Sequence, residues 1–383
     1  MGDRKKVLAL FEYFSPAIAA GGPIKSALGF AEGLSEELDI LIATRDSDMG
    51  NKRPMPGIVS DHEYSREGYR VIYLSAKKLK KNLALLILRK PDIVYLNSFF
   101  AWQFAILPLL LVRLLRTKSR LVLAPRGQFA ASAISKSKWR KKVYLVVYRT
   151  LLENASTLYQ ASSEFEKKDI LSVLPKRHVQ VSSNLRPQAE ADFRYLSINK
   201  AHAFKLCTIA RIHPIKNIHL AIKCVLPLVP FGVKLDVYGF MEDVEYLEHC
   251  QQLAMAGNGN IRLLPALQAE DVMPTITNYH AFLLPTKGEN FGHVIFEALL
   301  AGRPVIISDQ TPWRNLQKAE AGFDLPLNNV DWFTNAIRSL MDMDQPVFDR
   351  WCNCAHQLAT ASLDHQNRID QHRQLFEIAI ANR

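Results

Sequence analysis

The sequence predicts an α/β protein whose sheets are parallel and doubly wound. Short apolar segments with the length of strands alternate with segments in which apolar residues recur at three and four positions, as in amphipathic helices. A polar, irregular stretch over 186–202 divides this alternation into two series, and 383 residues suit two or three domains. We therefore predict a first domain over 1–190, a second over 200–361 and a final helix over 362–383.

The first series begins with an apolar strand at 7–11 and a helical pattern at 24–38. Further strands are predicted at 39–44, 69–74, 93–97 and 121–124. Ligands of doubly wound sheets bind beyond the C-terminal ends of the strands, so the residues that follow each strand are candidates for a site. Gly21 and Gly22 follow the first strand, and Arg126 follows the last.

The order of strand, glycine-containing turn and helix start is a common cradle for phosphate groups. Gly21 and Gly22 fit this order. The dinucleotide motif G-x-G-x-x-G is absent, however, and no Gly-Lys-Ser/Thr follows the glycines. A plain turn therefore stays open as the alternative for this loop.

The second series has strands at 206–209, 235–238 and 261–264. The loop after the first of them holds Arg211 and Lys216, five positions apart, and opens into a helix. An arginine and a lysine in such a loop can converge on one diphosphate, although plain surface charge is the alternative. Gly239 and Ala266 follow the next two strands.

The stretch 286–302 places two carboxylates beside the start of a helix. An apolar strand at 281–285 precedes it, and a helical pattern begins after Gly292. Glu289 then lies in the loop and Glu297 lies about one and a half turns into the helix. The helix start suits a phosphate and the carboxylates suit sugar hydroxyls. A helix-dipole partner and a solvated glutamate are the alternatives.

Three motifs carry a family resemblance. E-N-F-G-H-V-I-F-E over 289–297, followed by A-L-L-A-G-R-P-V-I, resembles the E-x7-E signature of the retaining group 1 (family 4) glycosyltransferases of the GT-B fold. A-R-I-H-P-I-K-N over 210–217 is similar to their G-R-x-x-x-x-K-N element, with Ala210 where glycine is usual. L-A-P-R-G-Q-F-A over 123–130 resembles a subgroup acting on bacterial surface polysaccharide and lipopolysaccharide, in which histidine is commoner at the place of Arg126.

The resemblance implies two Rossmann-like domains that face each other across a deep cleft, with the final helix crossing back to the first domain. It implies a nucleotide-sugar donor, no metal and no separate cofactor. The implied catalytic residues are Glu289, Arg211, Lys216 and Arg126. The implied donor-binding residues are Gly21, Gly22, Gly239, Ala266, Asn290, Phe291, Gly292, His293 and Glu297.

In this family the arginine and the lysine neutralise the departing nucleoside diphosphate, a role that the resemblance assigns to Arg211 and Lys216. Glu289 would hold hydroxyls of the donor sugar, and Glu297 would hold the ribose hydroxyls. Arg126 stays charged and cannot act as a base, so it would bind a phosphate or an acceptor carboxylate. The alternative for Arg126 is an exposed loop arginine.

The net charge of +11 is concentrated in the first half: residues 1–195 are near +14 and the remainder is near −3. The segments 77–90 and 136–152 predict basic amphipathic helices that suit an anionic membrane surface. The alternative is that their apolar faces are core and their charges solvated. No nucleic-acid recognition motif accompanies the charge. We expect a cytoplasmic protein with reduced cysteines, because we find no signal peptide or spanning segment.

These observations predict a retaining glycosyltransferase that moves a hexose-type sugar from a nucleotide diphosphate to a lipid-linked or polysaccharide acceptor. A sugar-nucleotide epimerase of the same fold and a non-catalytic GT-B binding scaffold stay open as alternatives. Asp46-Ser47-Asp48 has the spacing of the metal motif D-x-D, which belongs to a different transferase fold. Because no partner ligands accompany it, we expect a solvated loop there.

Overall fold

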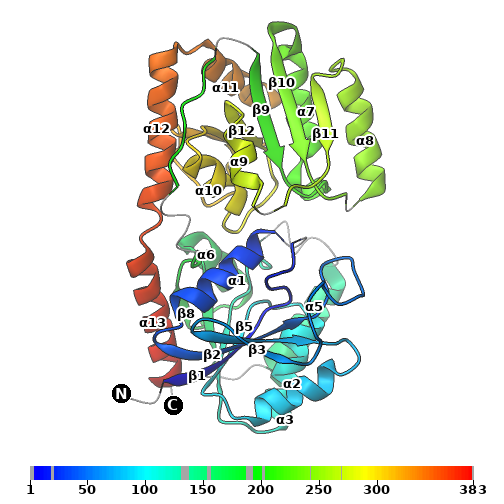
Figure 1. Cartoon of the computed structure of the whole chain (residues 1–383), viewed down its shortest axis with the longest axis vertical. Helices are drawn as coiled ribbons and strands as arrows, with labels where there is room; N and C mark the ends of the chain where they lie inside the picture. Colours follow the sequence, from blue (N-terminus) through cyan, green and yellow to red (C-terminus); the bar gives the residue numbers. More distant parts are fainter. Residues whose placement is uncertain are drawn as a thin grey trace. The chain divides into compact units, whose positions relative to one another are not determined.

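A computed structural model gives the structure of residues 4–18, 21–130, 138–152, 157–186, 193–200, 203–241, 243–268 and 270–381. The chain forms two compact units, which we call the first and the second domain (Figure 1). The first domain comprises residues 1–190 together with 365–383, and the second comprises 191–364. The last helix therefore belongs to the first domain although it follows the second in sequence.

The first domain is built on an eight-stranded sheet with the order β3-β4-β2-β1-β5-β6-β7-β8. Its strands are β1 (Lys5–Leu10), β2 (Leu38–Arg45), β3 (Glu63–Ser65), β4 (Tyr69–Leu74), β5 (Ile93–Leu96), β6 (Arg120–Leu123), β7 (Leu158–Ala161) and β8 (Val179–Val181). Neighbouring strands are parallel, except that β3 pairs with β4 in the antiparallel sense. All five strands predicted for this region are present, with ends within two residues of those expected.

Helices cover both faces of this sheet, and strand β1 shows why. Successive side chains of a strand point to opposite faces, so Val7 and Ala9 belong to one core and Leu8 and Leu10 to the other. The first core is closed by α1 (Gly22–Gly33) and α13 (His365–Ala381). The second core lies under α2 (Leu79–Leu88), η1 (Trp102–Ile106), α3 (Leu107–Leu114), α5 (Lys138–Val147), η2 (Tyr148–Leu152) and α6 (Glu164–Val173).

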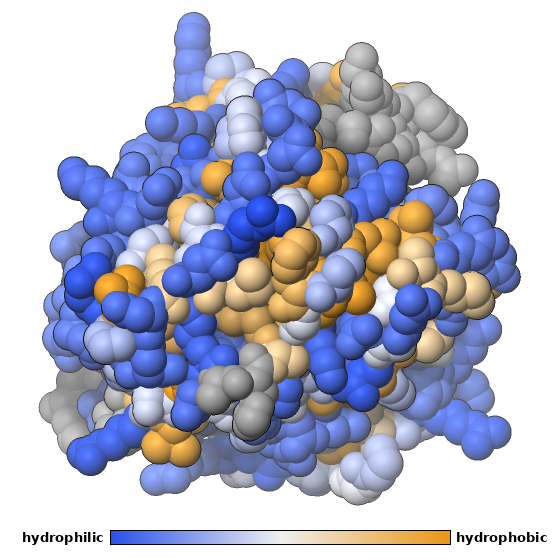
Figure 2. All heavy atoms as spheres, turned by 90° about the horizontal axis from the view of Figure 1, so that it is seen from above, coloured by the Kyte–Doolittle hydropathy of each residue, from blue (hydrophilic) through white to orange (hydrophobic). Residues whose placement is uncertain are grey.

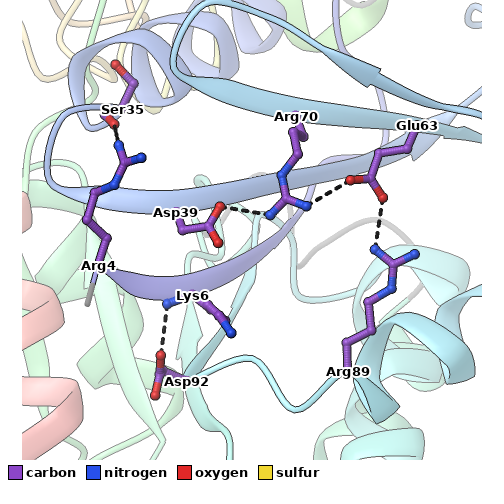
Figure 3. Close-up of polar contacts among 8 residues, drawn as sticks. All are labelled: Arg4, Lys6, Ser35, Asp39, Glu63, Arg70, Arg89 and Asp92. Carbon is purple, nitrogen blue, oxygen red and sulfur yellow. Dashed lines mark hydrogen bonds and ion pairs between the residues drawn. The ribbon is translucent and has the colours of Figure 1, made fainter.

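An ion-pair network fastens the edge of this sheet to the end of α2 (Figure 3). Arg70 of β4 pairs with Asp39 of β2 at 2.8 Å and with Glu63 of β3 at 2.9 Å. The other oxygen of Glu63 pairs with Arg89, directly after α2, at 2.8 Å. Burial raises the pKa of Glu63, but the bonds and charges of Arg89 and Arg70 outweigh burial and lower this pKa below its ordinary value.

The second domain is built on a six-stranded, fully parallel sheet with the order β11-β10-β9-β12-β13-β14. Its strands are β9 (Phe204–Ile209), β10 (Val233–Tyr238), β11 (Ile261–Leu264), β12 (Ala281–Leu284), β13 (Val305–Ser308) and β14 (Gly322–Leu325). Its helices are η4 (Pro214–Lys216), α7 (Ile218–Val225), η5 (Leu226–Phe231), α8 (Val244–Met255), α9 (Val272–Ile276), α10 (His293–Leu300), α11 (Val330–Asp342) and α12 (Gln345–Ala361).

The stretch predicted as a linker is partly built into the second domain. Its described residues 193–200 have no regular secondary structure. They are nevertheless held by Arg303, whose fully buried guanidinium donates to the carbonyl of Leu196 at 2.8 Å. A Cβ atom at Gly302 would lie 2.4 Å from the ring of Tyr195, so the strand-entry turn at this glycine and the stretch 193–200 fit closely together.

Apolar side chains also reach the surface. Figure 2 shows a face of the molecule on which they gather near the middle, surrounded by hydrophilic residues. In the second domain Phe231 is 64% exposed and Met255 is 75% exposed. Among the residues that the structure describes, no helix combines the length and the apolar character needed to cross a membrane.

Candidate active site

The predicted second-domain residues gather at one edge of the sheet. Because β9, β10 and β12 are parallel neighbours or next neighbours, their C-terminal ends lie at the same edge. Arg211 follows β9, Gly239 follows β10 and Glu289 follows β12. The loops that the sequence places far apart are therefore adjacent in the folded domain.

Lys216 and Glu289 form an ion pair at this edge. The Nζ atom of Lys216 donates to Oε1 of Glu289, and the two side chains are only 15% and 14% exposed. The local sequence explains how the lysine is presented, because His213 caps the short helix η4 by accepting from the backbone N–H of Ile215 at 3.1 Å. Asn217, in the left-handed conformation, then ends this turn immediately after Lys216.

The loop that carries Glu289 is fixed by backbone hydrogen bonds to its neighbours. The N–H of Lys287 and the buried hydroxyl of Thr286 both donate to the carbonyl of Ile215, at 2.8 and 3.1 Å. The N–H of Glu289 donates to the carbonyl of Gln310, after β13, at 3.0 Å. The carboxylate is therefore held between the loops that follow β9 and β13, and its position does not depend on the lysine alone.

The helix α10 begins four residues after Glu289 and has no side-chain cap. Gly292 precedes the helix with φ of 74°, a conformation that favours glycine, and a Cβ atom there would lie 2.8 Å from Cδ1 of Ile295. No side chain caps the helix and its first turn holds no acidic residue. The backbone N–H groups of the first turn and the helix dipole therefore suit a phosphate.

Trp313 fixes the loop that enters α10. Its indole Nε1 donates to the carbonyl of Phe291 at 2.8 Å, and the two rings lie 6.0 Å apart. The Phe291 ring also packs against His293 with centroids 4.9 Å apart, and Trp313 packs against Phe296. The sequence around Trp313 indicates no more than a turn, because nothing local shows that it meets Phe291.

The remaining second-domain candidates lie at the same edge or on α10. Glu297 is 4% exposed, so the interpretation of this residue as a solvated glutamate is wrong. Asn290 lies in the loop before α10. Gly239 lies so close to the preceding strand's loop that a Cβ atom would be 2.0 Å from the carbonyl oxygen of Ala210, which explains why this position is glycine. Ala266 is exposed in the loop after β11.

In the first domain, Arg126 is held by three uncharged acceptors. Its Nε donates to Oδ1 of Asn97 at 2.6 Å, Nη1 donates to Oδ1 of Asn184, and Nη2 donates to the hydroxyl of Tyr95. The backbone N–H of the next residue donates to the carboxylate of the buried Glu166. The interpretation of Arg126 as an exposed loop arginine is therefore wrong, because its side chain is half-buried and ordered by hydrogen bonds.

Gly21 and Gly22 form the start of α1 in the same domain. Gly21 is the N-terminal cap with φ of 64°, and no side chain caps this helix either. Residues 19 and 20, just before it, lie outside the described residues. The strand β1, the turn and the helix occur in the predicted order, and the uncapped start suits an anion.

The D-x-D stretch opens a loop whose residues 50–54 are exposed, but Asp46 itself is not solvated. Asp46 is buried and accepts from the hydroxyl of Ser60 at 2.7 Å, and Asp48 accepts from the backbone N–H of Ile18 at 2.9 Å. The expectation of a solvated loop is therefore wrong for Asp46, whereas it is right for the residues at 50–54. Within the described ranges, no group of three or more His, Cys, Asp or Glu residues is arranged to bind a metal ion.

Two parallel α/β domains, each with uncapped helix starts at the C-terminal edge of its sheet, define a two-domain Rossmann-like protein. Solved structures confirm that this is the predicted GT-B fold. Sucrose-phosphate synthase from Thermosynechococcus elongatus superposes with a TM-score of 0.74 at 16% identity, covering 98% of both chains. HepE from Anabaena in complex with UDP-glucose has a TM-score of 0.70 at 15% identity, covering 97% of this chain and 99% of that one.

A third structure is WaaG, a glycosyltransferase involved in lipopolysaccharide biosynthesis, with a TM-score of 0.66 at 15% identity, covering 96% of this chain and 98% of that one. No curated protein matches the sequence. Residues 203–343 match the family described as glycosyl transferases group 1. This match lies within the second domain, and the solved structures show the fold of the whole chain.

Proposed function

We propose that the protein is a retaining glycosyltransferase that transfers a hexose-type sugar from a nucleoside-diphosphate donor to a lipid-linked or polysaccharide acceptor in cell-surface glycan biosynthesis. One observation carries the proposal: the Lys216–Glu289 ion pair lies in the loops beside the uncapped start of α10. A cation, an acid and a helix start are the groups that a sugar diphosphate requires.

Departure of the nucleoside diphosphate builds negative charge on its phosphates. Lys216, Arg211 and the N–H groups at the start of α10 stabilise that charge, which lowers the barrier to breaking the glycosidic bond. Because these groups supply positive charge themselves, we expect no divalent metal to be required. Glu289 holds hydroxyls of the donor sugar and Glu297 holds the ribose, which fixes the reacting geometry. The acceptor's hydroxyl then attacks from the face that the diphosphate leaves, and its proton goes to an oxygen of the departing phosphate.

Arg126 supplies a positive charge in the first domain. The three side-chain acceptors that hold its guanidinium are an amide, a second amide and a phenol, all uncharged. Hydrogen bonds to neutral acceptors order the side chain without cancelling its charge. We therefore propose that Arg126 binds a phosphate or a carboxylate of the acceptor.

The test begins with thermal shifts against a panel of nucleoside diphosphates and their sugars, since a specific ligand stabilises the folded state. Transfer with the identified donor is then followed by NMR of the anomeric proton. We expect the product to keep the donor's anomeric configuration, and Glu297→Gln to weaken donor binding. An inverted product would contradict the retaining mechanism, and unchanged donor affinity in Glu297→Gln would contradict the role of that residue.

The same experiments separate the two alternatives. An epimerase would convert the sugar nucleotide when no acceptor is present, which product analysis detects. A binding scaffold would show a specific thermal shift with a nucleotide but no turnover with any acceptor in a panel of lipid-linked and polysaccharide acceptors.

We also propose that the first domain contacts an anionic membrane surface on the cytoplasmic side, through the helices that cover one face of its sheet. These helices, α2, α3 and α5, lie over the same core. They carry apolar side chains that are well exposed: Leu85, Leu88, Leu114, Val143, Val146 and Val147. The exposed lysines at 77, 78, 80 and 81 adjoin or belong to α2. Exposed apolar side chains among lysines suit an anionic bilayer.

The segment 77–90 carries both buried and exposed apolar side chains. Leu79, Leu83 and Leu86 are buried in the core, as the alternative to membrane contact requires. Leu85 and Leu88 are 51% and 50% exposed on the same helix. Of the second basic segment, the side chains of 136–142 lie outside the described residues, whereas Val143 and Val146 are 56% and 60% exposed.

Sedimentation with vesicles tests this contact. The protein should bind vesicles that contain anionic phospholipid and not neutral ones, and the variant Val143→Ser/Val146→Ser should bind less. Phe231→Ser/Met255→Ser is the matched control, because it removes apolar side chains that are at least as exposed from the second domain, the half of the chain without the positive charge. Equal binding by the two variants would count against the proposed surface.

A further inference from the structure

A buried chain of hydrogen bonds connects Arg126 to the last helix. The hydroxyl of Tyr95 accepts from Nη2 of Arg126 and donates to Oε1 of Gln160 at 2.7 Å. Nε2 of Gln160 lies 3.2 Å from Nε2 of His372 on α13. The side chains of Tyr95, Gln160 and His372 are all at most 1% exposed. The chain therefore runs from the end of β6 through β5 and β7 to α13, shielded from water.

A second branch reaches the same helix by a shorter route. Nη1 of Arg126 donates to the side-chain oxygen of Asn184. The backbone carbonyl of Asn184 in turn accepts from Nη1 of Arg368, also on α13, at 2.6 Å. Two of the three side chains that accept hydrogen bonds from Arg126 are therefore connected to α13: Tyr95 through Gln160 to His372, and Asn184 directly to Arg368.

The hydrogen-bond directions along the first branch are consistent with a neutral histidine. Nε2 of Gln160 must donate, since it also donates to the carbonyl of Ser182 at 2.8 Å, so Nε2 of His372 accepts. The proton of His372 then lies on Nδ1, which is 2.9 Å from the carbonyl of Arg368 and 2.8 Å from the hydroxyl of Ser182. Burial lowers the pKa of His372 to about 3, so the ring stays uncharged at neutral pH.

We propose that His372 and Arg368 of α13 are positioning residues for Arg126: they fix the acceptors that orient its guanidinium. The inference rests on the proposed function of Arg126 as the group that binds the acceptor's anion. It goes further, because it makes the orientation of the Arg126 guanidinium depend on the last helix. Residues 362–364 join α12 of the second domain to α13, so the helix that orients Arg126 directly follows one of the two points where the chain passes between the domains.

The test compares two substitutions of one residue. In His372→Leu the hydrogen-bond acceptor for Nε2 of Gln160 is lost, whereas in His372→Gln a side-chain oxygen can take the place of the histidine Nε2. Tyr148→Phe is the control, since it removes a buried tyrosine hydroxyl of the same domain that bonds to the hydroxyl of Tyr159. Each variant is measured for thermal stability, for affinity for the sugar donor, and for kcat and KM with the sugar acceptor.

We expect His372→Leu to lower kcat/KM for the acceptor about tenfold, as misplacement of a binding group does. Donor affinity should change less than twofold, because Arg211 and Lys216 lie in the other domain. His372→Gln should recover most of the loss, and Tyr148→Phe should keep its kcat/KM. If His372→Leu loses stability as Tyr148→Phe does but keeps the kcat/KM of the unaltered protein, the residue is structural only and the proposal is overturned.

A second readout decides the proposal even if the protein transfers no sugar. The Nε–H of Arg126, bonded to Asn97, should give a slowly exchanging side-chain NMR signal, assigned with Arg126→Lys. We expect this signal in the unaltered protein and in His372→Gln, and its broadening or loss in His372→Leu. An unchanged signal in His372→Leu overturns the positioning role, whereas absence of transfer with a changed signal overturns only the proposed function.

Discussion

Removing the charge of Lys216 should cost both stability and activity, by amounts that the burial of its ion pair sets. The two side chains are 15% and 14% exposed, so the pair lies closer to a buried ion pair than to a surface one. Surface pairs contribute up to about 1 kcal/mol, and breaking a buried pair costs about 3–5 kcal/mol. We expect Lys216→Met to lower the free energy of unfolding by about 2 kcal/mol, because Glu289 keeps an uncompensated charge.

The double variant separates the two effects. Lys216→Met/Glu289→Gln removes both charges, so it should be more stable than the sum of the single losses predicts, by about 1 kcal/mol or more. Its activity should not recover, because the cation that stabilises the departing diphosphate is still missing. We expect kcat of Lys216→Met to fall about 100-fold to 1,000-fold, as when one stabilising donor is removed from a transition state.

The assay is a double-mutant cycle by chemical denaturation, run beside steady-state transfer with the donor that the ligand panel identifies. Lys287→Met is the matched control, since this lysine is exposed and lies two residues from Glu289. It should keep both stability and kcat. Additive stability losses in the cycle, or a fall in kcat of less than tenfold for Lys216→Met, would refute the assigned role of the pair.

Three further outcomes follow from single contacts. Gly239→Ala should lower the free energy of unfolding by about 2 kcal/mol, measured by denaturation, because its Cβ would overlap the carbonyl oxygen of Ala210 and the backbone would have to shift. Trp313→Phe keeps an aromatic ring, though a smaller one, but loses the bond to the Phe291 carbonyl, so calorimetry should show weaker donor binding; equal affinity would contradict this. The folded pKa of Glu63 is depressed, so its contribution to stability is present above the unfolded pKa and is lost as pH falls through the folded pKa. Glu63→Gln should therefore reduce the loss of stability in acid, seen as a flatter dependence of melting temperature on pH below about 4.5.

The sequence by itself determined the type and order of the elements around the site. Apolar patterns predicted β1, β2, β4, β5 and β6 of the first sheet and β9, β10, β11 and β12 of the second, because the period of a buried strand or an amphipathic helix is visible in adjacent residues. They did not predict β3, β7, β8 or β14. It also placed Glu289 in a loop and Glu297 within the following helix, and the motifs around them predicted the GT-B fold that the solved structures confirm. The uncapped start of α10 follows from Gly292, a local signal.

Only the tertiary structure decided which of these residues meet. Lys216 and Glu289 are 73 residues apart, and Gln160 and His372 are 212 apart. Their contacts depend on the order of strands in each sheet and on where the last helix packs, and no local pattern states either. Packing also decided burial: Asp46, which we expected in a solvated loop, and Glu297, for which solvation was the alternative, are both buried. Local sequence determines the secondary-structure preferences of neighbouring residues, whereas the site is formed by residues that are distant in sequence and that the fold brings into contact.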